Sequence, residues 1–429
     1  MKTEYPFLLY ANDHGEVFED TELLMAGASG HTHFMPAKDD LTELPEGSDI
    51  FHLPGRRPIG WNPRSGKFEI CKKGWAVSAF VAPAYTIFAH AAWKTGKEAP
   101  RLPLYAYSAV GWYDDTFYVP ATRIDSDIRQ DCNQFNQKII IKNAKAWLKE
   151  NPGNRLLKHL SHCALVYFCP AARNYFLNRW EAPLPTSPSC NSRCLGCISY
   201  QPKSSEVVST QNRITFVPTP EEIAEIAVKH LETAPDPVVS YGQGCEGEPL
   251  MVWETLRESI KIIRSKTSKG IINLNSNSSK PDAVEQLCKA GLQSIRVSMN
   301  SAREELYNAY YKPKGYTFQD VLKSIEVARR NNLWISLNYF VFPGITDLET
   351  EKEKLCEIIE KYRINMIQWR NFNIDPEWYM AEVKEHIHGK ATGVKNMIDF
   401  VKEKYPWVYN GYFNPGKEII GSYMKKLPR

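Results

Sequence analysis

The run Ser189-Cys190-Asn191-Ser192-Arg193-Cys194-Leu195-Gly196-Cys197 decides how the chain is interpreted. It places three thiols close together, separated by three residues and then by two. Thiolates are soft ligands that suit zinc or iron–sulfur clusters, and a short curved loop can direct three of them to one centre. A four-iron cluster usually takes four cysteines, so three of them leave one iron open to a further ligand.

Two other interpretations of these cysteines stay open. A zinc site would need a fourth ligand, for which the sequence offers Cys169 or Cys245. The thiols could also be ordinary core residues, because free cysteine is among the most buried residue types. Three core cysteines at this spacing would be a rare coincidence, so the sequence favours a cluster.

The spacing C-x3-C-x2-C resembles the signature of the radical SAM superfamily, and the resemblance extends over roughly residues 182–375. It implies a [4Fe–4S] cluster on Cys190, Cys194 and Cys197 whose fourth iron binds S-adenosylmethionine. It further implies a radical SAM enzyme, handled under anaerobic conditions, with an electron donor such as flavodoxin or ferredoxin. Reductive cleavage would give methionine and a 5′-deoxyadenosyl radical that abstracts hydrogen from a substrate. Family members usually carry an aromatic residue where this chain has Gly196, and Tyr200 could supply that ring instead.

The composition is that of an ordinary globular chain. The chain has 429 residues, 43% of them hydrophobic and 24% charged, and its net charge of +4 is too small to argue for nucleic acid. Ten cysteines in this length do not form a disulfide framework, and their clustering predicts a reducing cytoplasm. The segment from Trp75 to Trp93 has no charged residue and is long enough to span a bilayer, but its aromatic and β-branched residues favour buried strands. We expect no membrane association.

Three regions follow from the patterns along the chain. Residues 1–181 predict a separate N-terminal domain of mixed β and helical structure, with hairpins at Asp13-His14-Gly15 and Asp114-Asp115, and with a role in substrate recognition. Residues 182–375 predict the barrel, and residues 376–429 a helical and aromatic extension.

Some polar and thiol residues of the N-terminal region invite a functional interpretation. Arg56 and Arg57 lie in a Pro/Gly-rich stretch expected to be a loop, where they could clamp an anion or simply be solvated. Cys163 and Cys169 could hold an auxiliary cluster, with Cys71 or Cys132, but their spacing does not single this out.

Strands and helices alternate after the cysteine loop. Predicted strands at residues 238–241, 271–275, 294–299, 334–340 and 364–369 follow a short first strand at 183–187, whose prolines confine it to an edge. Repeated βα units imply a parallel sheet, so the fold class is α/β. Six units resemble the partial (β/α)6 barrel of radical SAM enzymes, here joined to a separate N-terminal α+β domain.

Chemistry in such folds gathers at the carboxyl ends of the strands. Gly247-Glu248-Pro249 follows the second strand and resembles the family's Gly-Gly-Glu-Pro motif, which binds the amino group of S-adenosylmethionine; Glu246 replaces the first glycine. Asn277 follows the third strand, where small polar side chains can bind a ligand or cap a helix.

The fourth and fifth strands offer further cofactor-binding residues. The resemblance implies that Arg296 binds the cofactor's carboxylate and Ser298 its ribose, while Asn338 is expected to face the cofactor from the fifth strand. Arg296 and Ser298 share a face because strand side chains alternate, and a buried arginine is costly unless it is paired. Whether Asn300 also points inward stays open, and Arg370 is a candidate anion clamp or a surface ion pair.

Cys245 is the candidate catalytic residue, because its thiol could donate a hydrogen atom to a substrate radical; a small buried residue is the alternative. The substrate is not encoded in any motif. We expect a protein, a peptide or a polar small molecule, with RNA as an alternative. A non-catalytic zinc or iron–sulfur protein is the alternative from a different class.

Overall fold

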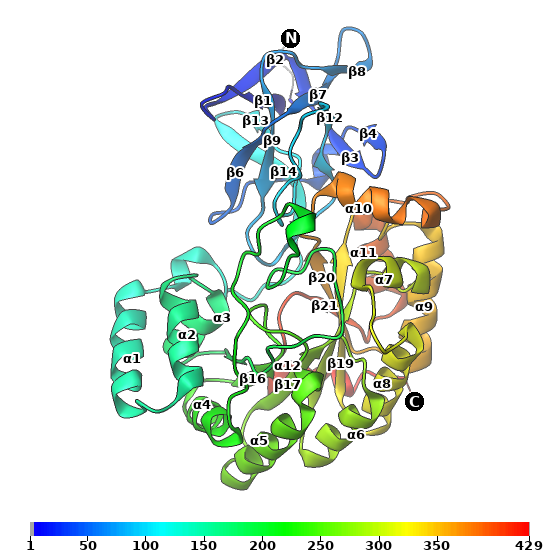
Figure 1. Ribbon diagram of the computed structural model, residues 1–429. Helices are drawn as coiled ribbons and strands as arrows, with labels where there is room; N and C mark the ends of the chain where they lie inside the picture. The colour runs from blue at the N-terminus through cyan, green and yellow to red at the C-terminus, as the bar shows by residue number, and fades with distance from the viewer. Residues whose placement is uncertain (1–3, 429) are drawn as a thin grey trace.

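The computed structural model describes residues 4–428, in which an antiparallel sheet region stands over a larger α/β unit (Figure 1). The eleven strands of the antiparallel sheet are β1 (Phe7–Ala11), β2 (Val17–Met25), β5 (Leu41–Glu43), β6 (Asp49–Leu53), β7 (Arg56–Asn62), β8 (Lys67–Ile70), β9 (Trp75–Phe80), β10 (Tyr85–Ile87), β12 (Trp93–Thr95), β13 (Gly111–Tyr113) and β14 (Thr116–Arg123). A small sheet beside it contains β3 (Gly27–Ser29), β4 (Thr32–Phe34) and β11 (His90–Ala91).

Both predicted hairpins form. Strands β1 and β2 pair antiparallel around Gly15, whose φ of 81° is left-handed. Strands β13 and β14 pair around Asp114 and Asp115, which have φ values of 50° and 57°. Positive φ at both central residues is what a two-residue hairpin turn requires, and aspartate tolerates it better than most residues.

The charge-free segment from Trp75 to Trp93 lies in the sheets, as expected. It contributes β9, β10 and β11, and Ala76, Ala79 and Ile87 within it are almost fully buried. Within residues 4–428, no helix has the length and apolar character that crossing a membrane needs.

The α/β unit is built on a parallel sheet with the strands in chain order: β15 (Glu181–Leu184), β16 (Val238–Tyr241), β17 (Ile271–Ser276), β18 (Ser294–Met299), β19 (Trp334–Val341), β20 (Met366–Asn371) and β21 (Tyr409–Gly411). The first strand is an edge strand, as its prolines require, and the sheet does not close. Six strands were expected, and β21 adds a seventh from the C-terminal extension, where it pairs parallel to β20.

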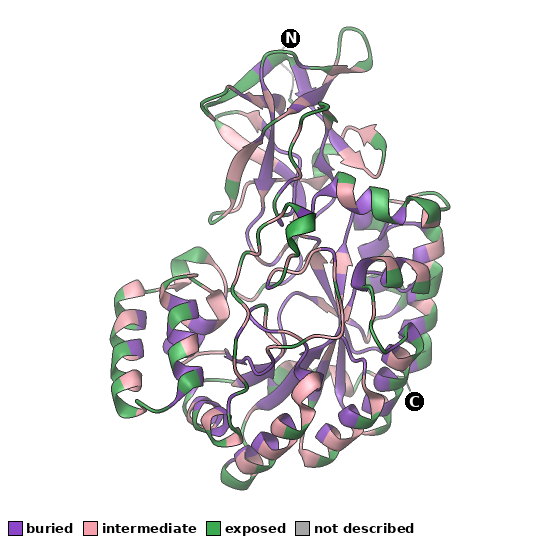
Figure 2. Ribbon diagram, in the orientation of Figure 1, coloured by how far each residue is buried: buried purple, intermediate pink, exposed green. Residues whose placement is uncertain are grey.

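Helices cover the outer face of this sheet, and the sheet itself is buried (Figure 2). They are α4 (Pro220–Thr233), α5 (Trp253–Lys266), α6 (Pro281–Ala290), α7 (Glu304–Tyr311), α8 (Phe318–Arg330), α9 (Glu349–Tyr362), α10 (Pro376–Val383), α11 (Val394–Lys404) and α12 (Lys417–Met424). Reciprocal capping boxes start α4 at Thr219 and Glu222 and α8 at Thr317 and Asp320. Helix α7 was not predicted from the sequence.

Three helices precede the sheet: α1 (Gln137–Glu150), α2 (Arg155–Leu165) and α3 (Pro170–Phe176). The Pro-rich linker predicts a boundary after residue 181, which groups these helices with the N-terminal sheet. They pack instead beside α4 and β15, and Leu156, Leu160 and Phe176 belong to the same hydrophobic core as the parallel strands (Figure 1). We therefore propose a boundary between β14 and α1.

The N-terminal sheet is attached at the carboxyl edge of the parallel sheet. Thr86 donates a hydrogen bond to the carbonyl of Trp369 at 2.8 Å, and the Ile87 N–H donates to Oδ1 of Asn371 at 2.9 Å. Both acceptors lie at the end of β20. The antiparallel region therefore covers the side of the α/β unit where chemistry is expected.

Arg56 and Arg57 belong to this attachment, which corrects the expectation of an anion-binding loop. They lie on strand β7, and Arg56 is buried, forms an ion pair with Asp375 at 3.5 Å and donates to the carbonyl of Pro100 at 2.9 Å. Arg57 stacks over the ring of Trp75. Both guanidinium groups are occupied by the protein itself, because β7 turns them against neighbouring elements.

Candidate active site

A cavity of about 210 Å³ lies at the carboxyl ends of strands β16, β17 and β18. It collects most of the residues that the sequence singled out. Its lining includes Cys190, Cys194, Cys197, Arg213, Glu246, Gly247, Glu248, Pro249, Asn277, Arg296, Ser298 and Tyr311. Residues from four separate stretches of the chain therefore meet in one place, which we name the cofactor cavity.

Helix α7 supports the cysteine loop. The N–H of Arg193 donates to the carbonyl of Tyr311 at 2.9 Å, and the N–H of Leu195 donates to the carbonyl of Tyr310 at 3.0 Å. Gly196 has no room for a ring, because a Cβ there would lie 3.0 Å from the hydroxyl of Tyr310. Tyr310 therefore takes the place beside the third cysteine, whereas Tyr200, expected to supply this ring, is 55% exposed.

The three thiols are spread too widely for one small ion. Within residues 4–428, a single set of three ligating side chains has its donor atoms all within 4.8 Å of one another, and Cys190, Cys194 and Cys197 are not that set. Burial raises the pKa of Cys190 to about 11 and that of Cys194 well above its ordinary value. A cationic metal centre reverses this effect because coordinated thiols are deprotonated. The donor set and its spread fit a multi-iron cluster.

The Gly247-Glu248 backbone lies directly on the cysteine loop. The N–H of Gly247 donates to the carbonyl of Ser187 at 2.7 Å, and the N–H of Glu248 donates to that of Ser189 at 2.8 Å. A Cβ at Gly247 would lie 2.0 Å from the carbonyl oxygen of Ser189. Only glycine permits this approach, which joins the loop after β16 to the cluster loop.

The two carboxylates of this motif hold backbone together. Glu248 accepts hydrogen bonds from the Asn277 N–H at 2.8 Å and from the Ser276 hydroxyl at 2.6 Å. Glu246 accepts from the N–H groups of Thr186 and Ser187, at 2.7 and 2.9 Å. Glu246, which the sequence suggested only as a departure from the motif, therefore fixes the start of the cysteine loop.

Asn277 extends the same network from strand β17. Its Nδ2 donates to Oδ1 of Asn191 at 2.8 Å and to the hydroxyl of Ser192 at 3.0 Å. Both acceptors lie within the cysteine loop. Asn277 thus lines the cofactor cavity and also positions the loop, so both roles expected for a small polar residue here are combined.

Arg296 and Ser298 face the cofactor cavity from strand β18, whereas Ile295 and Val297 between them are fully buried in the core. Nε of Arg296 is buried with no hydrogen-bond partner, and the ion pairs found within residues 4–428 include none to this side chain. Burial lowers the pKa of Arg296 to about 10. A buried guanidinium without a counter-ion favours an anionic ligand, such as the carboxylate of S-adenosylmethionine.

Comparison with known proteins agrees with this cavity. Residues 184–354 match the family model described as the radical SAM superfamily. The chain carries a radical SAM domain. Proteins of this family use a [4Fe–4S] cluster and S-adenosylmethionine, and the cofactor cavity provides three cysteines for the first and an unpaired buried arginine for the second.

Curated relatives match parts of the radical SAM chain. A GTP 3′,8-cyclase of Marinobacter nauticus is 26% identical over 217 residues, which cover 48% of this chain and 57% of the cyclase. A probable dual-specificity RNA methyltransferase RlmN of Thermotoga sp. is 28% identical over 127 residues, 28% of this chain and 36% of that protein. The match therefore spans little more than half of the cyclase and about a third of the methyltransferase.

Solved structures with similar folds include the hydrogenase maturase HydG from Carboxydothermus hydrogenoformans, with a TM-score of 0.38, 14% identity and coverage of 68% of this chain and 74% of that one. Streptococcus suis SuiB bound to its precursor peptide SuiA gives a TM-score of 0.38 at 12% identity, over 67% of this chain and 65% of that chain.

Three residues expected near the cofactor lie outside the cavity lining of the radical SAM domain. Asn338 pairs in register with Ser298, and its Oδ1 is buried without a hydrogen-bond partner. Asn300 is buried and donates to the hydroxyl of Tyr379 at 3.0 Å. Arg370 stacks on Tyr412 and donates to its carbonyl at 3.0 Å, so it is neither an anion clamp nor a surface ion pair.

Cys245 also faces away from the cofactor cavity, which corrects its expected role as a hydrogen donor to a radical there. Its neighbours Gly244 and Glu246 line the cavity, but the Cys245 thiol is only 6% exposed and lies 3.3 Å from Nε2 of His159 on α2. The loop after β16 presents backbone to the cavity and turns this side chain to its back.

A second hollow of about 460 Å³ adjoins the cofactor cavity, and we name it the vestibule. The two share Ser192, Cys194, Cys197 and Arg213. Further vestibule residues are Arg101, Arg193, Tyr200, Lys312, Trp378 and Glu382. Arg101 comes from the antiparallel region and stacks over Trp378 of α10. The vestibule thus combines the N-terminal region, the cysteine loop and α10.

Arg213 is the residue that sequence reasoning missed at the radical SAM site. Its Nη2 lies 3.6 Å from Sγ of Cys197, within reach of a hydrogen bond, and its Nε donates to the hydroxyl of Ser199 at 3.2 Å. Arg213 lies in a loop without a motif, so no signal in the sequence pointed to it.

Proposed function

We propose that this protein is a radical SAM enzyme whose substrate carries an anionic group, such as a phosphate or a carboxylate, and binds in the vestibule. When bound, the cluster and S-adenosylmethionine supply a 5′-deoxyadenosyl radical that can remove hydrogen from an unactivated carbon. The protein orients the substrate and excludes water, and the covering N-terminal region contributes to both.

The charge of the vestibule is the observation that carries this proposal. Four cationic side chains line it: Arg101, Arg193, Arg213 and Lys312. Glu382 is the single carboxylate in the lining and is already paired with Lys312 at 3.0 Å. The remaining positive charge beside the cluster cysteines favours an anionic substrate at the reacting centre.

The names of the curated relatives support the same chemistry. GTP and RNA, which those names contain, both carry phosphate groups. The aromatic residues Tyr200 and Trp378 in the vestibule are stacked under Arg213 and Arg101, an arrangement that also suits a planar base. We therefore favour a nucleotide-like or other polar small molecule and keep RNA as the second candidate, because three listed-length matches of about a third are to RNA methyltransferases.

The test uses the full chain reconstituted anaerobically with iron and sulfide. With dithionite and S-adenosylmethionine we expect 5′-deoxyadenosine, and none from Cys194→Ala. Nucleotides, carboxylates and short RNAs are then added separately, and the anionic substrate should raise the yield of 5′-deoxyadenosine and itself lose a hydrogen atom.

The variant Arg101→Ala separates the vestibule from the chemistry. We expect a rise in KM for the substrate with little change in uncoupled cleavage of S-adenosylmethionine, while the exposed Arg64→Ala leaves both unchanged. A chain that holds zinc on the three cysteines in place of iron and sulfide would overturn the enzyme proposal. A neutral substrate insensitive to Arg101→Ala would overturn only the choice of substrate class.

A further inference from the structure

Behind the cofactor cavity lies a cluster of three ligating side chains. Nε2 of His159 lies 3.3 Å from Sγ of Cys245 and 3.5 Å from Sγ of Cys163. Within residues 4–428, this is the single set of three or more metal-ligating side chains whose donor atoms all lie within 4.8 Å of one another. None of the three lines the cofactor cavity or the vestibule.

The fold brings these residues together from two elements. His159 and Cys163 are four residues apart on α2, so they share one face of the helix. Cys245 lies in the loop after β16, against which that face packs. Both thiols are nearly inaccessible, at 2% for Cys163 and 6% for Cys245, and His159 is partly buried.

The separations are those of ligands on one small ion. With zinc bonds of about 2.3 Å to sulfur and 2.0–2.1 Å to nitrogen, a tetrahedral site places its nitrogen and sulfur ligands about 3.6 Å apart. The observed 3.3 and 3.5 Å agree with that value. Two thiolates and one imidazole are a ligand set that zinc takes, and soft thiolates disfavour magnesium or calcium.

We propose that His159, Cys163 and Cys245 bind a single zinc ion, separate from the iron–sulfur cluster. A fourth position is left for water or for the thiol of Cys169, which starts α3 beside this site; its N–H donates to the carbonyl of Cys163 at 3.0 Å. The wider cysteine triad takes the cluster and the compact trio takes the zinc.

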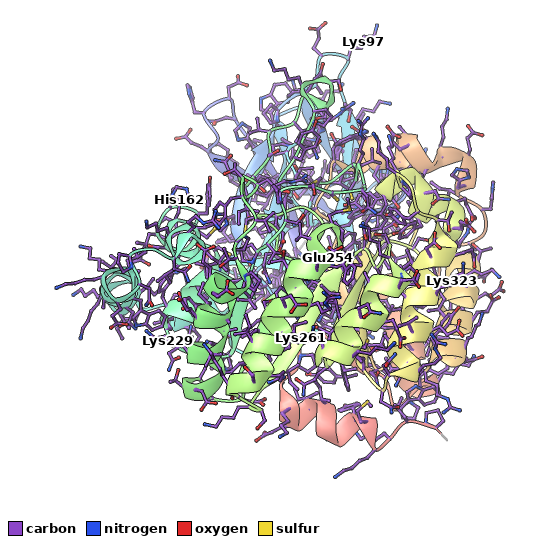
Figure 3. The ribbon with its side chains drawn as sticks, turned by 60° about the horizontal axis from the view of Figure 1, so that its bottom comes forward. Lys97, His162, Lys229, Glu254, Lys261 and Lys323 are labelled. Carbon is purple, nitrogen blue, oxygen red and sulfur yellow. The ribbon has the colours of Figure 1, made fainter. Side chains whose placement is uncertain are left out.

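The position of the ion gives it a structural consequence. Gly244 and Glu246 flank Cys245 and line the cofactor cavity. The zinc ion would therefore anchor the loop after β16 to α2, and through that loop hold Gly247 and Glu248 against the cysteine loop. Helix α2, whose exposed residue His162 is labelled in Figure 3, carries the other two ligands.

The experiment uses the full chain in which Cys190, Cys194 and Cys197 are all replaced by serine, so that the cluster ligands cannot take zinc. After zinc loading and desalting, elemental analysis should give about one zinc ion per chain, as a mononuclear site requires. Cobalt(II) loading should give thiolate-to-metal charge-transfer absorption. Adding Cys245→Ser or His159→Ala should lower zinc affinity by more than about 100-fold, beyond the loss that an outer hydrogen-bond partner causes.

Two matched variants serve as controls: His162→Ala, on the exposed side of α2, and Cys71→Ser, a buried cysteine of the N-terminal sheet. Both should keep the zinc. Circular dichroism identifies any variant that fails to fold, and the cobalt spectrum of the parent chain then decides. A parent chain without zinc and without a cobalt–thiolate band would overturn the proposal. So would a disulfide between Cys163 and Cys245 in the purified protein, or unchanged zinc in folded Cys245→Ser.

Discussion

Arg296 donates a hydrogen bond from Nη1 to Oε1 of Gln368 at 3.2 Å, and the pair links strands β18 and β20 across β19. This neutral partner holds the guanidinium in place without cancelling its charge. The arginine therefore keeps a buried positive charge beside the three cysteines, which is the electrostatic basis of the cofactor cavity.

Replacing Arg296 by glutamine should weaken binding of S-adenosylmethionine. A hydrogen bond to a charged group contributes about 1.5–3 kcal/mol, so we expect about a 10- to 100-fold loss of affinity. Calorimetric titration of the reconstituted protein measures this. Arg370→Gln is the matched control, because Arg370 lies outside the cavity lining and stacks on Tyr412. Equal losses in both variants would show that Arg296 does not contact the cofactor.

Gly247 should not tolerate a side chain. In Gly247→Ala the new Cβ would meet the Ser189 carbonyl oxygen at 2.0 Å, so the two loops must separate. We expect loss of S-adenosylmethionine binding and a lower melting temperature by calorimetry. Gly421→Ala is the control: Gly421 lies within α12 with no atom near its added Cβ, and the change should stabilise by up to about 1 kcal/mol. A fully functional Gly247→Ala would refute the close approach.

Arg213 should tune the reduction potential of the cluster. Its guanidinium lies 3.6 Å from Sγ of Cys197, and positive charge or hydrogen bonding at a cluster sulfur stabilises the reduced form. Arg213→Gln should shift the potential to more negative values by tens of millivolts, where about 59 mV is a tenfold change for one electron. Electron paramagnetic resonance during a redox titration measures the shift. Arg64→Gln, on the exposed surface, should leave the potential unchanged.

Acid should weaken the contact between α2 and α4. Arg155, followed by the backbone N–H groups at Thr219 and Arg155, lowers the pKa of Glu222 to about 2 from an ordinary 4.5. The folded state thus binds the proton less readily, so this contribution to stability is present above pH 4.5 and is lost as the pH falls toward 2. Arg155 is 46% exposed, which screens the pair.

The variant Glu222→Gln tests this pH dependence. It should lower the free energy of unfolding by about 0.5–2 kcal/mol at neutral pH, mainly through the weakened capping box, and flatten the loss of stability between pH 4.5 and 2. Urea unfolding at several pH values measures both effects. Glu254→Gln is the control, since Glu254 is exposed and forms no ion pair among the residues described here. An unchanged pH profile in Glu222→Gln would contradict the assignment.

The sequence alone determined the architecture of the radical SAM domain. Its five strands after the cysteine loop lie within two residues of their predicted bounds, because buried parallel strands and capped amphipathic helices are local patterns. It also identified Arg296 and Ser298 as a pair on one face, since alternation along a strand depends only on the backbone. The match of Gly247 to its motif rests on the same kind of local constraint.

Tertiary structure decided where side chains outside regular elements point. Arg213 has no motif, and only the fold places it beside Cys197. Cys245 follows a strand whose loop lines the cofactor cavity, yet its thiol turns back to His159, more than 80 residues earlier in the chain. Arg56 was expected in a loop and lies buried against Asp375, over 300 residues away. Such pairings are set by packing between elements, about which local patterns carry no information.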